Sequence, residues 1–212
     1  MEVDERMNRR PLASRDRPWA AVAVRLLLRT PITPNQISLL GIVFSAIGAW
    51  AIAQGPRVPW AFLIGALSIQ LRLLCNLLDG MVAVEGKRAS SAGSLYNEIP
   101  DRFEDTFFIV AFGCAAALSW LGFVAALLAM FTAYIRVLGG SLGFAQDFRG
   151  PMAKQHRMAT LTLGCLAAFV ESVIGPTLYC VKLALAVVAL GSLLTAARRI
   201  LAISTQLASR QS

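Results

Sequence analysis

The stretch that decides the fold is NLLDGMVAVEGKRASSAGSLYNEIPDRFED, residues 76–105, which lies between two segments that are otherwise apolar enough to span a membrane. It contains six of the chain's twelve acidic residues, and these are Asp79, Glu85, Glu98, Asp101, Glu104 and Asp105. Ionisable side chains at membrane depth are costly to keep, so a cluster of them is a functional-site hypothesis by default. The stretch therefore predicts a polar site within a membrane protein, and a metal ion bound in it.

The composition of the whole chain indicates a multi-pass membrane protein. Of its 212 residues, 57% are hydrophobic and only 15% are charged, which does not describe a soluble domain. A spanning helix needs about 20 mostly apolar residues, and six such segments are expected, at residues 36–54, 59–80, 98–119, 121–144, 157–175 and 178–197. We therefore expect an all-α fold with a cytoplasmic N-terminal segment (1–34) that includes an interfacial helix, a six-helix domain (35–200) and a cytoplasmic tail (201–212).

The positions of lysine and arginine give the expected orientation, because positive charge accumulates in short cytoplasmic segments. Fifteen of the twenty basic residues lie in four segments that share one side of the membrane, namely 1–36, 84–92, 146–157 and 198–212. This pattern places both termini and the acidic hairpin in the cytoplasm and the chain in the inner cell membrane. The alternative of a cleaved signal peptide rests on an AxA pattern at Ala51 and Ala53, although such a leader is unusually long.

Two other features narrow the class of protein. The net charge of +8 is spread over membrane-flanking segments rather than gathered on one face, which favours anionic lipid over nucleic acid as the partner. The four cysteines each lie alone in an apolar segment, without the spacing of a zinc site or a disulfide framework. We therefore expect no nucleic-acid partner, and cysteines that serve as small core residues.

The segment before the first span predicts a helix that lies along the membrane surface. In WAAVAVRLLLR (19–29), Trp19, Ala23, Leu26 and Leu27 share one helical face. Pro31 and Pro34 separate this helix from the first span, and Thr33 and Pro34 are suited to its N-cap and first helical positions. The free N–H groups of that first turn are available to a phosphate.

Helical spacing turns the acidic stretch into a site. On the second span, positions separated by four and three residues share a face, and on the third span a second row repeats every four residues. The first row is Arg72, Asn76, Asp79 and Ala83, and the second is Asn97, Asp101 and Asp105, with Glu98 at its edge and Glu104 turned partly away. A short loop joins the two helices, so both rows are expected to meet, and their hard oxygen ligands favour Mg²⁺ or Mn²⁺.

These residues resemble the signature of the CDP-alcohol phosphatidyltransferase family, DxxDGxxAR followed after a short gap by GxxxDxxxD. The corresponding stretches here read NxxDGxxAV (76–84) and GxxxNxxxD (93–101). TPNQIS (33–38) also resembles the sequence with which these enzymes open their first span. Six spans preceded by an interfacial helix agree with the family's layout.

The resemblance implies a transferase of phospholipid biosynthesis that displaces CMP from CDP-diacylglycerol, or from a related CDP-alcohol, with an acceptor hydroxyl. It implies divalent metal, Mg²⁺ or Mn²⁺, at Asn76, Asp79, Asn97 and Asp101, with Asp101 also acting as general base. It places Asn35, Gly80, Ala83 and Gly93 against the nucleotide, and it implies a homodimer. The acceptor stays open among glycerol phosphate, inositol phosphate, serine, sugars and other alcohols.

The chain departs from the signature at three positions, because Asn76 and Asn97 replace aspartates and Val84 replaces an arginine. Each missing carboxylate weakens the hold on two metal ions. Three outcomes follow: Glu98, Asp105 or a substrate phosphate restores the charge; the site works with one metal; or the protein is a non-catalytic relative that binds CDP-lipid. Lys87 or Arg88 is a candidate for the role of the missing arginine.

Further cations are expected near the same site. Lys154 and Arg157, in GPMAKQHR (150–157), and Arg136, in the fourth span, are candidates for binding an acceptor phosphate or a lipid phosphate. The alternatives are ordinary loop charge for Lys154 and Arg157, and pairing with Glu104 for Arg136. Arg72 is expected to neutralise part of the acidic row.

A transporter is the alternative from a different class, since membrane carboxylates also bind coupling ions. Transporters commonly show inverted repeats and broken helices near the bilayer midplane. The polar row of this chain lies near one end of its spans, and no repeat is evident, so the transferase is the favoured hypothesis.

Overall fold

The computed structural model describes residues 18–88, 92–175 and 177–210, apart from the side chains of Ser94 and Asn97, and these residues form seven α-helices and no strand. The helices are α1 (Pro18–Leu28), α2 (Pro34–Gln54), α3 (Trp60–Glu85), α4 (Gly93–Ala115), α5 (Ser119–Ser141), α6 (Lys154–Ile174) and α7 (Tyr179–Ala208). The prediction of an all-α fold is confirmed. Residues 1–17 of the expected N-terminal segment lie outside the described residues.

Five of these helices, α2, α3, α5, α6 and α7, are long and apolar enough to cross a membrane. The chain is thus a multi-pass membrane protein. The expected third span, 98–119, corresponds to α4, which has 23 residues but does not reach the same apolarity. The reason is its first half, which carries Glu98, Asp101, Arg102, Glu104 and Asp105.

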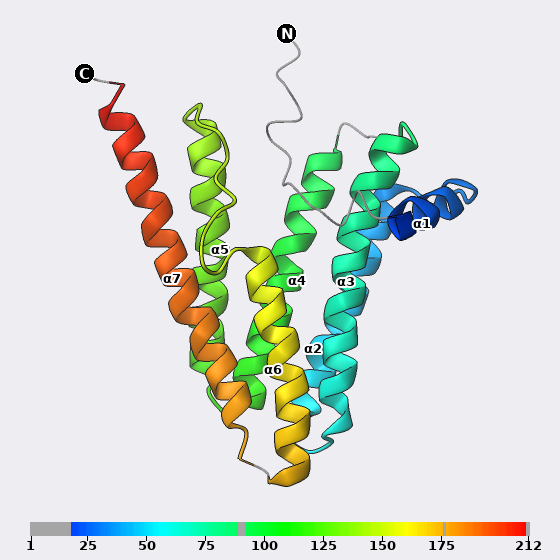
Figure 1. Ribbon diagram of the computed structural model, residues 1–212, viewed down its shortest axis with the longest axis vertical. Helices are drawn as coiled ribbons and strands as arrows, with labels where there is room; N and C mark the ends of the chain where they lie inside the picture. Colours follow the sequence, from blue (N-terminus) through cyan, green and yellow to red (C-terminus); the bar gives the residue numbers. More distant parts are fainter. Residues whose placement is uncertain (1–17, 89–91, 176, 211–212) are drawn as a thin grey trace.

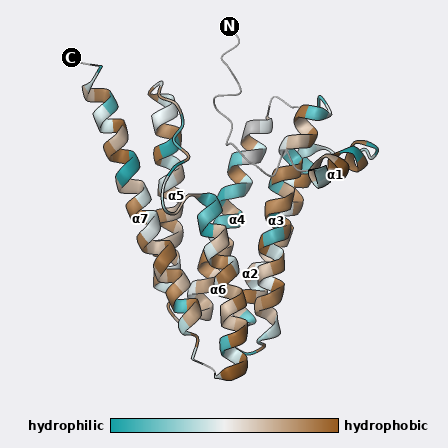
Figure 2. Cartoon of the chain, viewed as in Figure 1, coloured by the Kyte–Doolittle hydropathy of each residue, from teal (hydrophilic) through white to brown (hydrophobic). Residues whose placement is uncertain are grey.

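The helices are close together at one end of the molecule and spread apart at the other, where α1 and the C-terminus lie (Figure 1). Helix α2 packs against α3 and α4, α5 packs against α4 and α7, and α6 packs against α3 and α7. A core that includes Phe62, Ile69, Phe108 and Phe112 fills the narrow part of the bundle. Figure 2 shows hydrophilic residues at the wide end and where the start of α6 meets α4.

Small residues allow the helices of this bundle to approach closely, as is common in membrane proteins. A Cβ on Gly48 of α2 would lie 2.5 Å from Ser68 Cβ and 2.7 Å from the Phe108 ring, so α2 approaches both α3 and α4 at this glycine. At the turn between α4 and α5, a Cβ on Gly113 would lie 2.7 Å from Gly122 Cα. The first contact fixes α2 beside the two helices that carry the polar rows, and the second brings α5 against α4.

The predicted separation of α1 from α2 is confirmed, and so is the cap that begins α2. The Thr33 hydroxyl accepts from the Gln36 backbone N–H, and the Gln36 side chain accepts from the Thr33 N–H, which forms a capping box with Pro34 in the first turn. Helix α1 packs on α3 through Ala20 and Val24, whereas the predicted apolar face includes Trp19 and Leu26, which are exposed. Exposed apolar side chains on a helix across the wide end suit contact with lipid.

Several expected boundaries differ from those of the structure, and two of these differences change whether residues belong to a helix or to a connecting or terminal segment. Helix α6 begins at Lys154 rather than at 157, so the basic residues expected in a loop belong to its first turn. Residues 201–208, expected in a tail, continue α7.

Candidate active site

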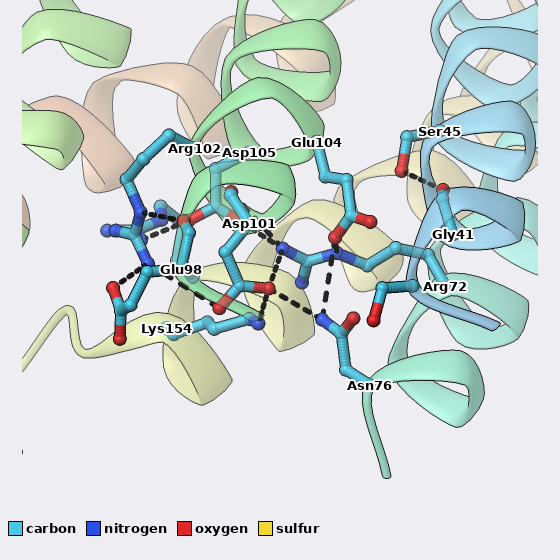
Figure 3. Close-up of polar contacts among 12 residues, drawn as sticks. Gly41, Ser45, Arg72, Asn76, Glu98, Asp101, Arg102, Glu104, Asp105 and Lys154 are labelled. Carbon is cyan, nitrogen blue, oxygen red and sulfur yellow. Dashed lines mark hydrogen bonds and ion pairs between the residues drawn. The ribbon is translucent and has the colours of Figure 1, made fainter. Parts of the chain in front are cut away.

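The two predicted polar rows meet, joined by side chains that reach across from α3 to α4 (Figure 3). The Asn76 amide donates to Asp101 Oδ1 over 2.7 Å. Arg72 donates through Nε to Glu104 Oε2 over 2.5 Å and through NH2 to Asp105 Oδ1 over 2.6 Å. The prediction that Arg72 neutralises part of the row is confirmed.

Asp79 is held differently from the acids of α4. Its Oδ2 accepts a 2.6 Å hydrogen bond from the Ser38 hydroxyl of α2, and its Oδ1 accepts from the Gly80 backbone N–H over 2.5 Å. The side chain is buried, and no ion pair within 4 Å is formed by it among the described residues. Asp79 is therefore held by hydrogen bonds rather than by a direct ion pair, unlike the acids of α4.

Asp101, the candidate general base, has two unlike oxygens. Its Oδ1 receives the Asn76 amide, the Lys154 ammonium and, over 3.4 Å, Arg72 NH2, whereas its Oδ2 lies 3.5 Å from the Arg102 guanidinium. Lys154 is 8% exposed and points from the first turn of α6 into the acidic row (Figure 3). The interpretation of Lys154 as ordinary loop charge is thus wrong, because burial beside Asp101 fixes its position.

Glu104 and Asp105 are buried in ion pairs. Asp105 Oδ2 accepts from Arg157, which lies one turn after Lys154 on α6 and is itself 1% exposed. Glu104 was expected to turn partly away from the row and to be a partner for Arg136, but it is fully buried against Arg72. It fits there because a Cβ at Gly41 of α2 would lie only 2.5 Å from Glu104 Oε1.

The partner of Arg136 is Glu98, at the edge of the α4 row. Its NH2 donates to both Glu98 oxygens, over 2.6 and 2.7 Å, and its NH1 donates to Gln146 Oε1 over 2.5 Å. The guanidinium also lies 5.0 Å from the Phe148 ring centroid, at cation–π distance. The expected pairing of Arg136 with Glu104 is therefore wrong, since Arg136, near the end of α5, lies beside the first turns of α4.

A narrow pocket beside the row gathers five basic side chains from four helices. Its lining is Arg102, Thr132, Ala133, Arg136, Ala153, Lys154, Arg157 and Arg199. Arg199 was not predicted, although it continues the buried stripe of α7 that includes Ser192 and Thr195. Such a concentration of donors fits an anionic group.

A larger cavity of about 360 Å³ adjoins this pocket and shares Arg136 and Arg199 with it. It lies between α5, α7 and the connection to α6, and its walls include Phe144, Phe148 and Ile203. In that connection, burial favours a higher pKa for Asp147, but hydrogen bonds from the Arg149 side chain and backbone N–H outweigh it and lower the pKa.

The residues expected around the nucleotide lie on three helices, α2, α3 and α4, and in the turn that follows α3. Asn35 lies in the first turn of α2, Gly80 and Ala83 continue the Asp79 face of α3, and Gly93 begins α4. Arg88 donates to the carbonyl oxygens of Thr30 and Ile32, so it ties the end of α3 to the connection between α1 and α2. Lys87 is exposed and has a positive φ of 50°.

The Asn97 side chain, a predicted metal ligand, lies outside the described residues.

The described part of the row offers few oxygen donors to a divalent ion. No group of three or more His, Cys, Asp or Glu side chains is placed to hold a metal among the described residues. Asp79 and the side-chain oxygen of Asn76 on α3, with the Asp101 carboxylate on α4, are the hard oxygen donors of the row. Mg²⁺ is commonly held by one or two carboxylates together with substrate phosphates, which this set can provide.

Comparison with known proteins identifies the fold. No family model matches the chain. It is 31% identical over 112 residues to the bifunctional IPC transferase and DIPP synthase of Rubrobacter xylanophilus, a match that covers 50% of the chain and 24% of that protein. The chain therefore spans about a quarter of the length of this curated relative.

Crystal structures of the phosphatidylinositol phosphate synthase of Mycobacterium tuberculosis are similar over most of the chain. The structure with CDP-DAG bound has a TM-score of 0.68 and 20% identity, and the match covers 87% of this chain and 92% of that one. The complex with manganese and citrate has a TM-score of 0.70 and 20% identity, with 88% and 89% covered. The chain has the fold of this synthase, which is the fold that its resemblance to the CDP-alcohol phosphatidyltransferases implied.

Proposed function

We propose that the chain is a membrane phosphotransferase of phospholipid biosynthesis. It transfers a phosphatidyl or phospho-alcohol group from CDP-diacylglycerol, or from a related CDP-alcohol, to an acceptor hydroxyl and releases CMP. The observation that carries the proposal is the contact of Asn76 on α3 with Asp101 on α4, close to Asp79 along α3 and beside a pocket of five cations. The likeness to a synthase solved with CDP-DAG bound supports the same donor.

The donor diphosphate belongs beside Asp79. Asp79 and the carbonyl oxygen of Asn76 hold a divalent metal, Mg²⁺ or Mn²⁺, and the relative solved with manganese supports this class of ion. When bound, such an ion neutralises the diphosphate and stabilises the leaving CMP. Gly80, Ala83 and Gly93 border this region, and Asn35 lies at the start of α2, where free backbone N–H groups suit a phosphate.

Asp101 is the general base. Asn76 and Lys154 hold its Oδ1 in place, and Oδ2 takes the proton from the acceptor hydroxyl. The acceptor oxygen then bonds to the phosphorus that carries the lipid, and the bond from that phosphorus to the oxygen of CMP breaks.

The acceptor carries an anionic group, which the pocket of five cations receives. Arg136 and Arg157 lie at this pocket, and each is already paired with a carboxylate, Glu98 and Asp105 respectively. Binding of a phosphate there competes with those carboxylates. The adjoining cavity of about 360 Å³ offers room for the rest of an alcohol. A phosphorylated polyol fits this combination better than serine or a neutral sugar does.

The proposal includes the membrane topology and the oligomeric state of the protein. The three-part organisation, with an N-terminal segment (1–34), a six-helix domain (35–200) and a tail (201–212), has both ends on the cytoplasmic side of the inner membrane. The protein works as a homodimer. Protease accessibility of tagged termini tests the location of the two ends, and cross-linking of the protein in membranes tests the homodimer.

The test is CMP release by the purified protein in detergent. CDP-diacylglycerol and Mg²⁺ or Mn²⁺ are supplied with matched pairs of acceptors, such as inositol phosphate with inositol and glycerol phosphate with glycerol. We expect CMP only with the phosphorylated member of a pair, and roughly 10²-fold less of it, or lower still, from an Asp101→Asn control. Metal-dependent binding of CDP-diacylglycerol with no CMP from any acceptor means a non-catalytic relative. Ion flux in proteoliposomes, without binding of CDP-diacylglycerol, means a transporter.

A further inference from the structure

Lys154 is buried, although a lysine does not need to be buried in order to form an ion pair. A lysine at the start of a membrane helix usually extends to the surface, where water solvates its ammonium. Lys154 is instead 8% exposed, and its ammonium contacts Asp101 Oδ1 between α3, α4 and α6 (Figure 3). Exposed lysines elsewhere in the chain, such as Lys182, show that burial is particular to this position.

The oxygen that Lys154 contacts is also used by Asn76. In the signature that the chain resembles, position 76 is an aspartate, and a carboxylate there beside Asp101 needs a cation between them. Here the Asn76 amide donates to the same Asp101 Oδ1, over 2.7 Å. Asp101 Oδ1 is therefore surrounded by N–H donors where the signature predicts a metal ion.

The charges of the two arrangements match. A carboxylate at position 76 with a divalent cation sums to +1, and the neutral amide of Asn76 with the ammonium of Lys154 also sums to +1. Electrostatic interactions are strong in a poorly solvated site. Replacing the carboxylate at position 76 by an amide therefore requires a smaller positive charge beside it, and the ammonium of Lys154 meets that requirement. The side chain of Asn97 lies outside the described residues and takes no part in this comparison.

We propose that Lys154 supplies, from within the protein, the positive charge of one of the two metal ions that the signature implies. The chain then binds one divalent ion per protomer, at Asp79, and Lys154 is a positioning residue that acts through Asp101. This inference deepens the proposed function and rests on it for the identity of the site.

The experiment counts bound ions directly. Mn²⁺ is titrated into the detergent-purified protein without substrate, and the free ion is followed by its EPR signal. We expect one Mn²⁺ per chain for the wild type and two for the double variant Asn76→Asp/Lys154→Met. Lys154→Arg keeps the charge and should keep the count at one, and so should the matched control Lys182→Met, whose lysine is exposed near the start of α7.

The inference is overturned if the wild type binds two Mn²⁺ ions, and also if it binds none. It is equally overturned if the double variant binds only one Mn²⁺ while it elutes and unfolds like the wild type. If the double variant does not fold, Asn76→Asp/Lys154→Gln replaces it, and the wild-type count still decides the first half of the inference.

The two proposals fail in different measurements. CMP release by a wild type that binds two Mn²⁺ leaves the proposed function standing and removes the role of Lys154. If the wild type binds one Mn²⁺ and the double variant binds two, but no acceptor gives CMP release, the role of Lys154 stands and the proposed transferase activity is wrong.

Discussion

The Ser38 hydroxyl of α2 donates a 2.6 Å hydrogen bond to Asp79 Oδ2, which joins the start of the first span to the central carboxylate of α3. The Ser38 hydroxyl oxygen also lies 3.2 Å from the Pro34 carbonyl oxygen in the first turn of its own helix. The orientation of Asp79 therefore depends on a helix that begins abruptly at the Thr33 cap. This hydrogen bond links the TPNQIS segment to the acidic row.

Asp79→Asn should abolish metal-dependent binding of CDP-diacylglycerol, because it removes the carboxylate that forms no ion pair within the described part of the chain. Ser38→Ala should weaken that binding by roughly 5- to 10-fold, the value of about one hydrogen bond. Calorimetry with and without Mn²⁺ measures both effects. Ser45→Ala, two turns along α2 and bonded to Gly41 O, is the matched control and should leave binding unchanged. Equal binding by Asp79→Asn and the wild type contradicts the assignment.

Asp101→Asn should lower CMP release by roughly 10²-fold or more while CDP-diacylglycerol still binds, since the amide keeps the shape but cannot take the proton. Asp105→Asn should affect thermal stability more than turnover, because Asp105 holds the buried guanidinium groups of Arg72 and Arg157. Turnover per folded molecule separates the two variants. Near-normal turnover in Asp101→Asn, with loss in Asp105→Asn, would move the base one turn along α4.

Arg72→Met should destabilise the protein by roughly 3–5 kcal/mol, because it leaves buried carboxylates without their shared cation. Adding Glu104→Gln should recover part of that loss, since Glu104 then no longer carries an unpaired charge. Unfolding in detergent of both single variants, the double variant and an Arg57→Met control gives the coupling. Additive effects of the two substitutions contradict the ion pair as the cause.

Much of the fold was predictable because hydropathy and helical period depend only on neighbouring residues. The spacing of Asn76, Asp79, Asp101 and Asp105 predicts two polar faces, and the short connection predicts that they meet. The composition of α4 was harder to interpret, because charged side chains that face the interior lower its apolarity without removing it from the bundle.

The pairing of cations with carboxylates was not predictable from local pattern. Lys154 and Arg157 reach Asp101 and Asp105 from more than 50 positions away, and which cation meets which acid depends on how α6 packs. A signal for Ser38 and Gly41 was present, since small residues at three- and four-residue spacing continue through Ser45 and Gly48 of α2. This spacing marks the face on which α2 approaches its neighbours.

Two variants of the Arg136–Glu98 pair should change acceptor affinity in opposite directions. Arg136 binds both oxygens of Glu98, so an acceptor phosphate has to compete for the same guanidinium. Arg136→Gln should raise the KM for a phosphorylated acceptor by roughly 10-fold or more, the value of a charge-assisted hydrogen bond. Glu98→Gln should lower it, because it releases the cation and leaves the metal site intact.

Steady-state CMP release at saturating CDP-diacylglycerol measures both KM values, with Arg57→Gln as an exposed arginine control. A shift in the same direction for both variants indicates that the pair only stabilises the junction of α4 and α5. A fall in bound Mn²⁺ for Glu98→Gln, measured by EPR, instead assigns Glu98 to the metal. Opposite shifts in KM with unchanged Mn²⁺ binding place the acceptor phosphate at Arg136, because a purely structural pair has no reason to favour the substrate when one partner is neutralised.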